Sequence, residues 1–421
     1  MIKPPLPISL LSLLLLVSLN IFGQSLTIDS CYSRARSNYP LIKQHSLIAT
    51  SQEYSLKNAA KGYLPQLSVA GQATYQSEVT KVSVPIPGVE IQSPSKDQYK
   101  LYGEVVQPLT DLVTVKLQKE LTNANAEVEQ QKLEVELYKL QDRINQLYFG
   151  VLIIDAQVEQ NQLLRGDIQR GIDKAKAGIA YGTALKSSAD LLKAELLKTE
   201  QRQIELQATR KAYLEMLGLF INQPLDTNTT LQTPLLPDLN TAITRPELSL
   251  YASQAKIYDT QRKLANNRTL PRFNIFLQGG MGRPALNLLN NDFEPYYIGG
   301  LRLNWNLSAF YTVNNERKNY GISQQIIDAQ KETFLFNLKL TLAQQDNEIA
   351  KLKALIQTDD DIVKLRENVK NASLAQLENG IITSNDYLSN LNAEDLAKQN
   401  LRLHQIQLLM AVYNYKTTSG N

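Results

Sequence analysis

Side chains that could do chemistry are few in this sequence of 421 residues. It contains two histidines, His45 and His404, which are far apart, and a single cysteine, Cys31. A zinc site needs several Cys or His ligands at short spacing, and one cysteine cannot form an internal disulfide. No glycine-rich phosphate loop or Gly-x-Ser-x-Gly turn is present. We therefore predict no catalytic residue, no metal and no cofactor, and a protein that is not an enzyme.

One acidic run, Asp359 to Asp361, raises the possibility of a cation site. Consecutive residues of a helix point in different directions, so at most one or two of the three carboxylates could face the same side. The run is more typical of a solvated helix face, and Cys31 of a packed side chain than of a nucleophile.

The overall charge argues against a nucleic-acid partner. There are 44 Lys and Arg residues and 41 Asp and Glu residues, a net charge of +3, and no basic cluster. Residues 1–23 have the short apolar run of a secretory signal peptide, although a membrane anchor is the alternative. After residue 23 no apolar stretch is long enough for a membrane-spanning helix.

The elements that position the remaining side chains occur twice. KGYLPQLSV (61–69) and NRTLPRFNI (267–275) each change from a helical pattern to strand alternation at a proline, Pro65 or Pro271. Proline disfavours helical geometry in the residue before it and lacks an N–H donor. Pro40 and Pro246 each stand 25 residues before these prolines, so we predict a duplicated chain.

Each half is predicted to contain a strand hairpin followed by a coiled-coil hairpin. The first repeat spans 24–221, a linker spans 222–245, the second repeat spans 246–417, and a tail spans 418–421. We expect strands at about 66–79, 98–109, 272–282 and 296–307, and coiled-coil hairpins at about 112–219 and 309–415.

A 3-4 spacing of apolar residues predicts the coiled coils. In the first half it runs from Leu133 to Val158, and in the second from Leu335 to Val363 with Gln345 and Asp359 as interruptions. Gly178, Gly182 and Gly380 suit left-handed helix ends. Ser187-x-x-Asp190 and Thr383-x-x-Asp386 suit the start of a returning helix.

The strands have two different faces. We predict that one face meets lipid, through Leu67, Val69, Leu301, Leu303 and Trp305. The other face is predicted to line water, through Gln72, Thr74, Arg302, Asn304 and Asn306. Four strands cannot close a barrel, and only closed barrels or helices satisfy every backbone group in a bilayer. The pattern therefore indicates a membrane barrel shared between chains.

With these features in this order, the sequence resembles the TolC-like outer membrane efflux family over essentially the whole mature chain. The resemblance rests on NYP (38–40), the YLPQLSV (63–69) and TLPRFNI (269–275) junctions, and the Gly-to-Asp turns at 182–190 and 380–386. It implies a mainly α fold with four strands per chain, which complete a 12-stranded barrel in a homotrimer and continue into a periplasmic α-helical barrel.

The resemblance also implies an outer membrane channel of a Gram-negative bacterium that docks to a periplasmic adaptor protein and an inner membrane pump in a tripartite export system. The docking tip would carry Gly178, Gly182, Ala184, Asp190, Gly380, Thr383, Ser384 and Asp386, with Ala184 and Ser384 at its surface. A soluble periplasmic coiled-coil structural or adaptor protein is the alternative. The sequence leaves the exported substrate open.

Overall fold

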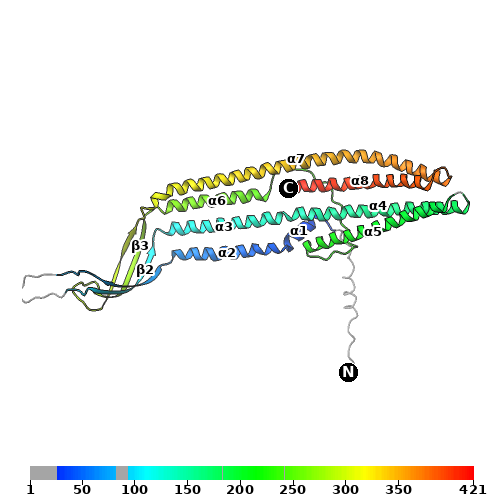
Figure 1. The fold of residues 1–421 in the computed structure, drawn as a ribbon. Helices are drawn as coiled ribbons and strands as arrows, with labels where there is room; N and C mark the ends of the chain where they lie inside the picture. The colour runs from blue at the N-terminus through cyan, green and yellow to red at the C-terminus, as the bar shows by residue number, and fades with distance from the viewer. Residues whose placement is uncertain (1–25, 82–92, 183, 241) are drawn as a thin grey trace, which may run out of the picture. The chain divides into compact units, whose positions relative to one another are not determined.

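The computed structural model describes residues 26–81, 93–182, 184–240 and 242–421. The predicted signal peptide (1–23) and most of the loop after the first strand lie outside these residues. In chain order the elements are α1 (Ile28–Asn38), η2 (Pro40–Ile42), α2 (Lys43–Ala60), η3 (Lys61–Tyr63), β1 (Gln66–Tyr75), β2 (Asp97–Pro108), α3 (Leu112–Tyr138), α4 (Leu140–Ala180), α5 (Lys186–Ile221), α6 (Pro246–Asn267), β3 (Arg272–Arg283), β4 (Glu294–Asn304), α7 (Ala309–Glu378) and α8 (Ser384–Ser419) (Figure 1).

The chain forms two compact units, and each contains segments from both halves of the sequence. One unit comprises residues 43–134 and 247–333 and holds all four described strands. The other comprises residues 1–42, 135–246 and 334–421 and holds the two hairpins of long helices. Each unit therefore contains corresponding parts of both sequence repeats.

The first unit contains a single antiparallel sheet of order β1-β2-β3-β4 among the described residues. Its register pairs Leu67 with Val105, Val105 with Leu277, and Phe273 with Leu303. Every pair joins two odd-numbered or two even-numbered positions, so residues of one parity share a face across all four strands. η3 ends at Tyr63, and the next residue, Leu64, is extended as expected before Pro65.

The second unit is built on the predicted apolar stripes. Leu137, Leu140, Ile144, Val151 and Ile154 are buried. The long first helix is interrupted at Lys139, which separates α3 from α4. In the second stripe Leu338, Leu342, Ile349 and Leu352 are buried. Both interrupting polar residues bond to α8: Gln345 donates to Thr418 at 3.0 Å, and Asp359 lies 2.6 Å from His404 Nδ1.

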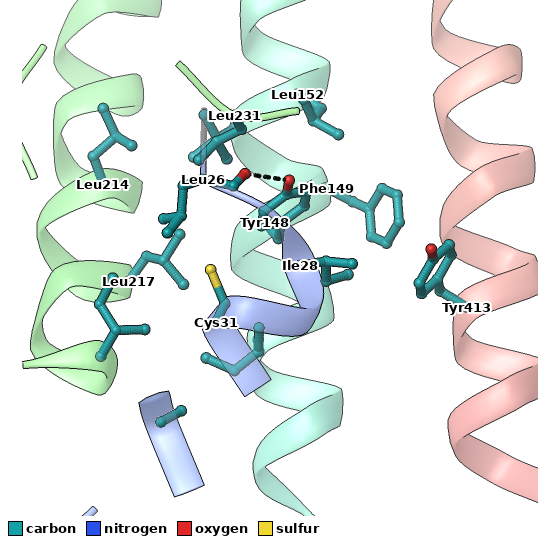
Figure 2. Close-up of a cluster of buried hydrophobic side chains, with 14 residues drawn as sticks. Leu26, Ile28, Cys31, Tyr148, Phe149, Leu152, Leu214, Leu217, Leu231 and Tyr413 are labelled. Carbon is teal, nitrogen blue, oxygen red and sulfur yellow. Dashed lines mark hydrogen bonds between the residues drawn. The ribbon is translucent and has the colours of Figure 1, made fainter. Parts of the chain in front are cut away.

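A buried cluster in this unit holds two non-helical segments of the chain against α4 (Figure 2). The hydroxyl of Tyr148 on α4 lies 2.7 Å from the carbonyl oxygen of Leu26 and 2.6 Å from that of Gln232. Burial raises the pKa of Tyr148, so this hydroxyl stays a neutral donor. Cys31 is fully buried in the same cluster, as a packed side chain. The first segment of the described chain and the segment after α5 are thus both held against α4.

Candidate functional site

The sheet in the unit of residues 43–134 and 247–333 has one strongly apolar face. It carries the exposed side chains of Leu67, Val69, Leu101, Val105, Ile275, Leu277, Met281, Leu301 and Leu303. None of these side chains is covered by another described element of the chain, and Leu67 and Val69 are 79% and 80% exposed. An apolar surface of this extent is unusual on a soluble monomer and marks contact with lipid or another chain.

Aromatic side chains stand at both ends of this apolar face. Tyr75 and Tyr99 lie at the strand ends that are far from the helices, paired through the register with Asp97 and Arg283. Trp305 follows β4 at the helix end, and its ring lies 6.5 Å from that of Phe310. Two aromatic bands that flank an apolar band are typical of a strand surface that crosses a bilayer.

The opposite face of the sheet carries polar groups. Arg302 donates to Glu104 at 2.7 Å, and its guanidinium lies 4.3 Å from the centre of the Phe276 ring. Gln72, Thr74 and Asn304 lie on this face as well, because they share its even-numbered positions. Leu67, Val69, Leu301 and Leu303 therefore share the odd-numbered face, and Gln72, Thr74, Arg302 and Asn304 the even-numbered face. Asn306 and Trp305 follow β4 beyond its last paired residue.

The two helical turns lie together in the other unit. Ile172 and Leu192 of the first hairpin share a buried cluster with Tyr387 and Leu391 of the second. Lys174 lies 2.8 Å from Glu378, which adds an ion pair between the hairpins. The helices next to the two turns are therefore packed against each other.

The turns differ in how their helices begin and end. Gly182 and Gly380 adopt the left-handed conformation, with φ of 74° and 67°. Gly178 instead lies inside α4, where its carbonyl accepts a hydrogen bond from the amide of Ala184. Thr383 and Asp386 form a full capping box, and these hydrogen bonds lower the pKa of Asp386.

Two expectations at the tip need correction. α5 begins after Leu185 without a side-chain cap, so Ser187 lies within its first turn, and Asp190 pairs with Lys193 instead. Ser384 is buried rather than at the surface, because the capping box turns it toward the paired hairpins. Asn385 is the exposed neighbour.

The tip also has apolar side chains that the sequence analysis did not select. Tyr181, Leu185 and Ile381 all extend into solvent, and Tyr181 is 85% exposed. They stand in the turns, outside the apolar stripes of the helices. These residues could have been recognised in the sequence because they are apolar but fall outside the 3-4 spacing of the helix stripes.

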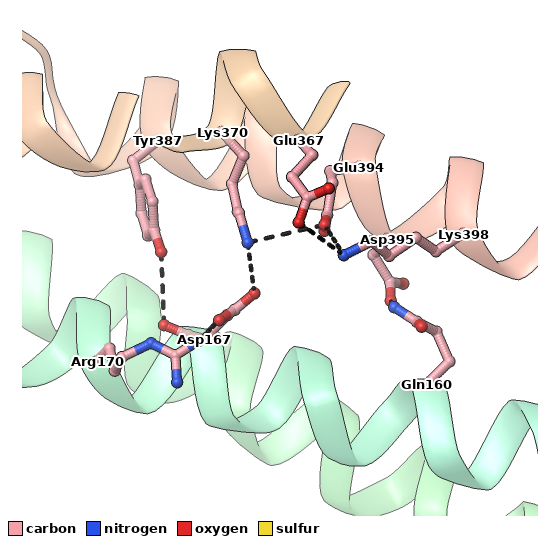
Figure 3. Close-up of polar contacts among 9 residues, drawn as sticks. All are labelled: Gln160, Asp167, Arg170, Glu367, Lys370, Tyr387, Glu394, Asp395 and Lys398. Carbon is pink, nitrogen blue, oxygen red and sulfur yellow. Dashed lines mark hydrogen bonds and ion pairs between the residues drawn. The ribbon is translucent and has the colours of Figure 1, made fainter. Parts of the chain in front are cut away.

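A buried polar network joins the hairpins a few turns from the tip (Figure 3). Lys370 on α7 lies 3.3 Å from Asp167 on α4 and 3.7 Å from Glu394 on α8. Arg170 also pairs with Asp167, and Lys398 with Glu394. Next to them, Gln160 donates to Asp395 at 2.8 Å. Charges this well buried are tolerated because each has a partner of opposite sign.

Within the described part of the chain, no group of three or more His, Cys, Asp or Glu residues could hold a metal ion. Among the same residues, no helix has the length and apolar character to cross a membrane.

Comparison with known proteins supports the fold. No family model matches the sequence, and no curated protein matches it. Solved structures do match. The outer membrane protein VceC from Vibrio cholerae has a TM-score of 0.67 at 13% identity, over 94% of this chain and 96% of that one. CusC has a TM-score of 0.69 at 12% identity, over 96% of both chains. The MtrE outer membrane channel from Neisseria gonorrhoeae has a TM-score of 0.66 at 12% identity, over 94% and 89%. The chain therefore has the TolC-like fold of outer membrane channels over nearly its whole length.

Proposed function

We propose that this protein is an outer membrane channel, the passive exit duct of a tripartite efflux or export system. The observation that carries the proposal is the two-faced sheet. Its apolar face is uncovered and flanked by aromatic side chains, and its other face holds Arg302, Glu104 and other polar groups. A bilayer would cover the first face, and a water-filled pore would hydrate the second.

Four strands require further copies of the chain to close such a barrel. Three copies would supply twelve strands, which agrees with the homotrimer expected from the sequence. The fold that this chain shares with VceC, CusC and MtrE, all described as outer membrane or channel proteins, supports a channel. The helical part would then lie in the periplasm.

The paired helical turns are the proposed docking site for a periplasmic adaptor protein, which would link the channel to an inner membrane pump. Tyr181, Leu185 and Ile381 offer exposed apolar contacts, and the capping box of Thr383 and Asp386 holds the turn beside them in place. A partner with apolar helix surfaces would bury these side chains, which gives a favourable free energy of association.

Two variants test the docking site without disturbing the buried core. Leu185→Ser and Ile381→Ser remove apolar surface from the tip and should leave membrane insertion and oligomer formation unchanged. Export and cysteine cross-linking to a co-expressed adaptor from position 184 or 385 should both fall. Leu219→Ser, another exposed leucine in α5 but far along the chain from the turn, is the matched control. Normal export by both tip variants would place docking elsewhere.

Localisation tests the channel itself. The protein should fractionate with the outer membrane and change its gel migration on heating, as folded membrane barrels do. Recovery as a soluble periplasmic protein would contradict the proposal.

A further inference from the structure

One row of residues across the apolar face of the sheet lacks side chains in its middle. The register pairs Val69 with Gly103, Gly103 with Gly279, and Gly279 with Tyr297. All four positions are odd-numbered, so they belong to the apolar face. The two inner strands, β2 and β3, therefore place only backbone in this row, and the outer strands place a side chain at each end.

This row forms a hollow of about 700 Å³ in the apolar face. Its floor is the backbone of the two glycines. The neighbouring row of the sheet, Leu67, Val105 and Leu277, stands along one side, and Val69 and Tyr297 stand at the two ends. The other lining residues are even-numbered, so their side chains point to the opposite face. The hollow is therefore apolar along its whole length.

Packing within the chain does not require glycine at either position. A Cβ atom on Gly103 would come no closer than 3.9 Å to another part of the chain, and one on Gly279 no closer than 3.8 Å. Neither glycine adopts the left-handed conformation. The next residue, Gly280, is different, because a Cβ atom there would lie 2.2 Å from the carbonyl oxygen of Leu101.

Glycine inside a strand is unfavourable, because it loses more conformational freedom on folding and offers no side chain to pack. At Gly280 the close approach of the neighbouring strand explains the residue. At Gly103 and Gly279 no contact among the described residues does so. A molecule that occupies the hollow from outside the chain would explain both.

The hollow runs obliquely along the sheet. Val69 lies near the start of β1, which is the end of that strand next to the helices. Tyr297 lies near the start of β4, which is the end far from the helices, and Tyr75 and Tyr99 stand at the same far end on the same face. Tyrosines gather at the interface between membrane and water. The hollow therefore leads from the far aromatic band into the apolar band.

We propose that the hollow binds one acyl chain of a lipid from the outer leaflet of the membrane. The inference rests on the proposed channel, in which the helices lie in the periplasm and the far strand ends lie in the outer leaflet. The polar part of the lipid then lies beside the hydroxyl of Tyr297, which is 78% exposed, and the chain lies over the two glycines against Val105 and Leu277.

The dimensions and the forces fit such a chain. Three spacings between neighbouring strands, of about 4.8 Å each, give the hollow a length of roughly 14 Å. This is close to half of the ~30 Å hydrocarbon core, which is the depth of one leaflet. Bulk lipid is as apolar as the hollow, so binding depends on van der Waals contact, and bare glycine backbone permits the closest approach. In a barrel the apolar face of every copy points outward, so a neighbouring copy does not fill the hollow.

Photolabelling in proteoliposomes tests the proposal. The full-length protein is reconstituted with phosphatidylethanolamine that carries a diazirine on one acyl chain, and the labelled residues are mapped by mass spectrometry. Labelling should be several-fold stronger at Val69, Val105 and Leu277 than at Leu301 and Leu303, which lie on the same apolar face outside the hollow.

A variant that fills the hollow gives the matched comparison. Gly279→Val should lower labelling at Val105 and Leu277 several-fold and leave labelling at Leu301 unchanged. It should not lower stability in detergent without lipid, because the Cβ atom has room and a β-branched side chain suits a strand. Gly71→Val, on the same face but outside the hollow, should leave the labelling pattern unchanged. Gly103→Ala repeats the test if Gly279→Val fails to insert.

The outcomes separate the lipid site from the channel. Equal labelling over the whole apolar face, in both the parent protein and Gly279→Val, would show bulk lipid only and would overturn the site while leaving the channel intact. Protection of the hollow with strong labelling at Leu301 would show a different occupant and also overturn it. No labelling anywhere on the apolar face would instead count against the proposed function, because that face would then not meet lipid.

Discussion

The ammonium group of Lys370 on α7 lies 3.3 Å from the carboxylate of Asp167 on α4, so a buried ion pair connects the two helical hairpins of one chain. Both side chains are largely buried, and a third group, Glu394 of α8, lies 3.7 Å from the same ammonium. The position continues the 3-4 spacing of the second apolar stripe through Asp359 and Val363.

Replacing Lys370 with Met should lower the free energy of unfolding by about 1–3 kcal/mol. This is less than the ~3–5 kcal/mol for a buried charge left without any partner, because Arg170 still pairs with Asp167 and Lys398 with Glu394. Denaturant unfolding in detergent measures the change. Lys364→Met, on the same helix but in an exposed pair with Asp361, is the control and should have little effect.

Asp395 should make stability depend on pH in an unusual direction. Burial raises its pKa above the ordinary value of 3.8, although Gln160 and Gln399 donate hydrogen bonds that oppose the shift. The folded state then holds this proton more tightly than the unfolded state. Stability contributed by this group therefore falls as the pH rises through the window between the ordinary and the raised pKa.

Asp395→Asn should remove the loss of stability at higher pH, because an amide can keep the hydrogen bond from Gln160 without a buried charge. The variant should be more stable than the parent protein at neutral pH and should lose part of the pH dependence. Thermal unfolding between pH 4 and pH 8 checks both. Equal slopes for variant and parent would show that the carboxylate does not titrate differently on folding. Asp361→Asn, at an exposed position, serves as the control.

The capping box at the second turn should contribute more to local stability than the side chains at the start of α5. Thr383→Ala removes the side-chain acceptor for the amide of Asp386 and should cost about 1 kcal/mol of local stability. Ser187→Ala should cost nothing measurable, because Leu185 rather than Ser187 precedes α5 and no side chain caps that helix. Amide hydrogen exchange at residues 381–390 and 184–192 measures the difference. Faster exchange in both variants would contradict the assignment.

The two faces of β1 should respond differently to the same charge. Val69→Arg places a cation on the apolar face and should hinder insertion, at a cost of about 2–4 kcal/mol near the middle of a bilayer. Ser68→Arg, one residue earlier, lies opposite Glu104 on the polar face and should insert normally. The second variant should shift ion selectivity toward anions. Similar insertion defects in both would reject the assignment of the faces.

Much of this fold could be predicted from the sequence because its local signals are strong. Pro65 and Pro271 mark the strand starts, and the 3-4 spacing from Leu133 marks the first coiled coil. The sheet order could not be read from the sequence. It depends on the pairing of β2 with β3, and the first coiled-coil hairpin separates these two strands along the chain.

The site was less predictable, for physical reasons. Ser384 follows a capping residue and therefore suggests the surface, yet packing between the two hairpins buries it. Lys370 and Glu394 look like ordinary charged helix residues, and only the neighbouring hairpin makes them a buried network. The exposed apolar residues Tyr181 and Leu185 are uncovered only because no described element packs on the turn.

Conductance of the purified protein in a planar lipid bilayer tests the central claim most directly. Particles with the mass of a trimer should produce stable single channels, and Ser68→Arg should change their ion selectivity while Val69→Arg should reduce the number of insertions. A homogeneous monomer that stays water-soluble without detergent and never produces a channel would contradict the account.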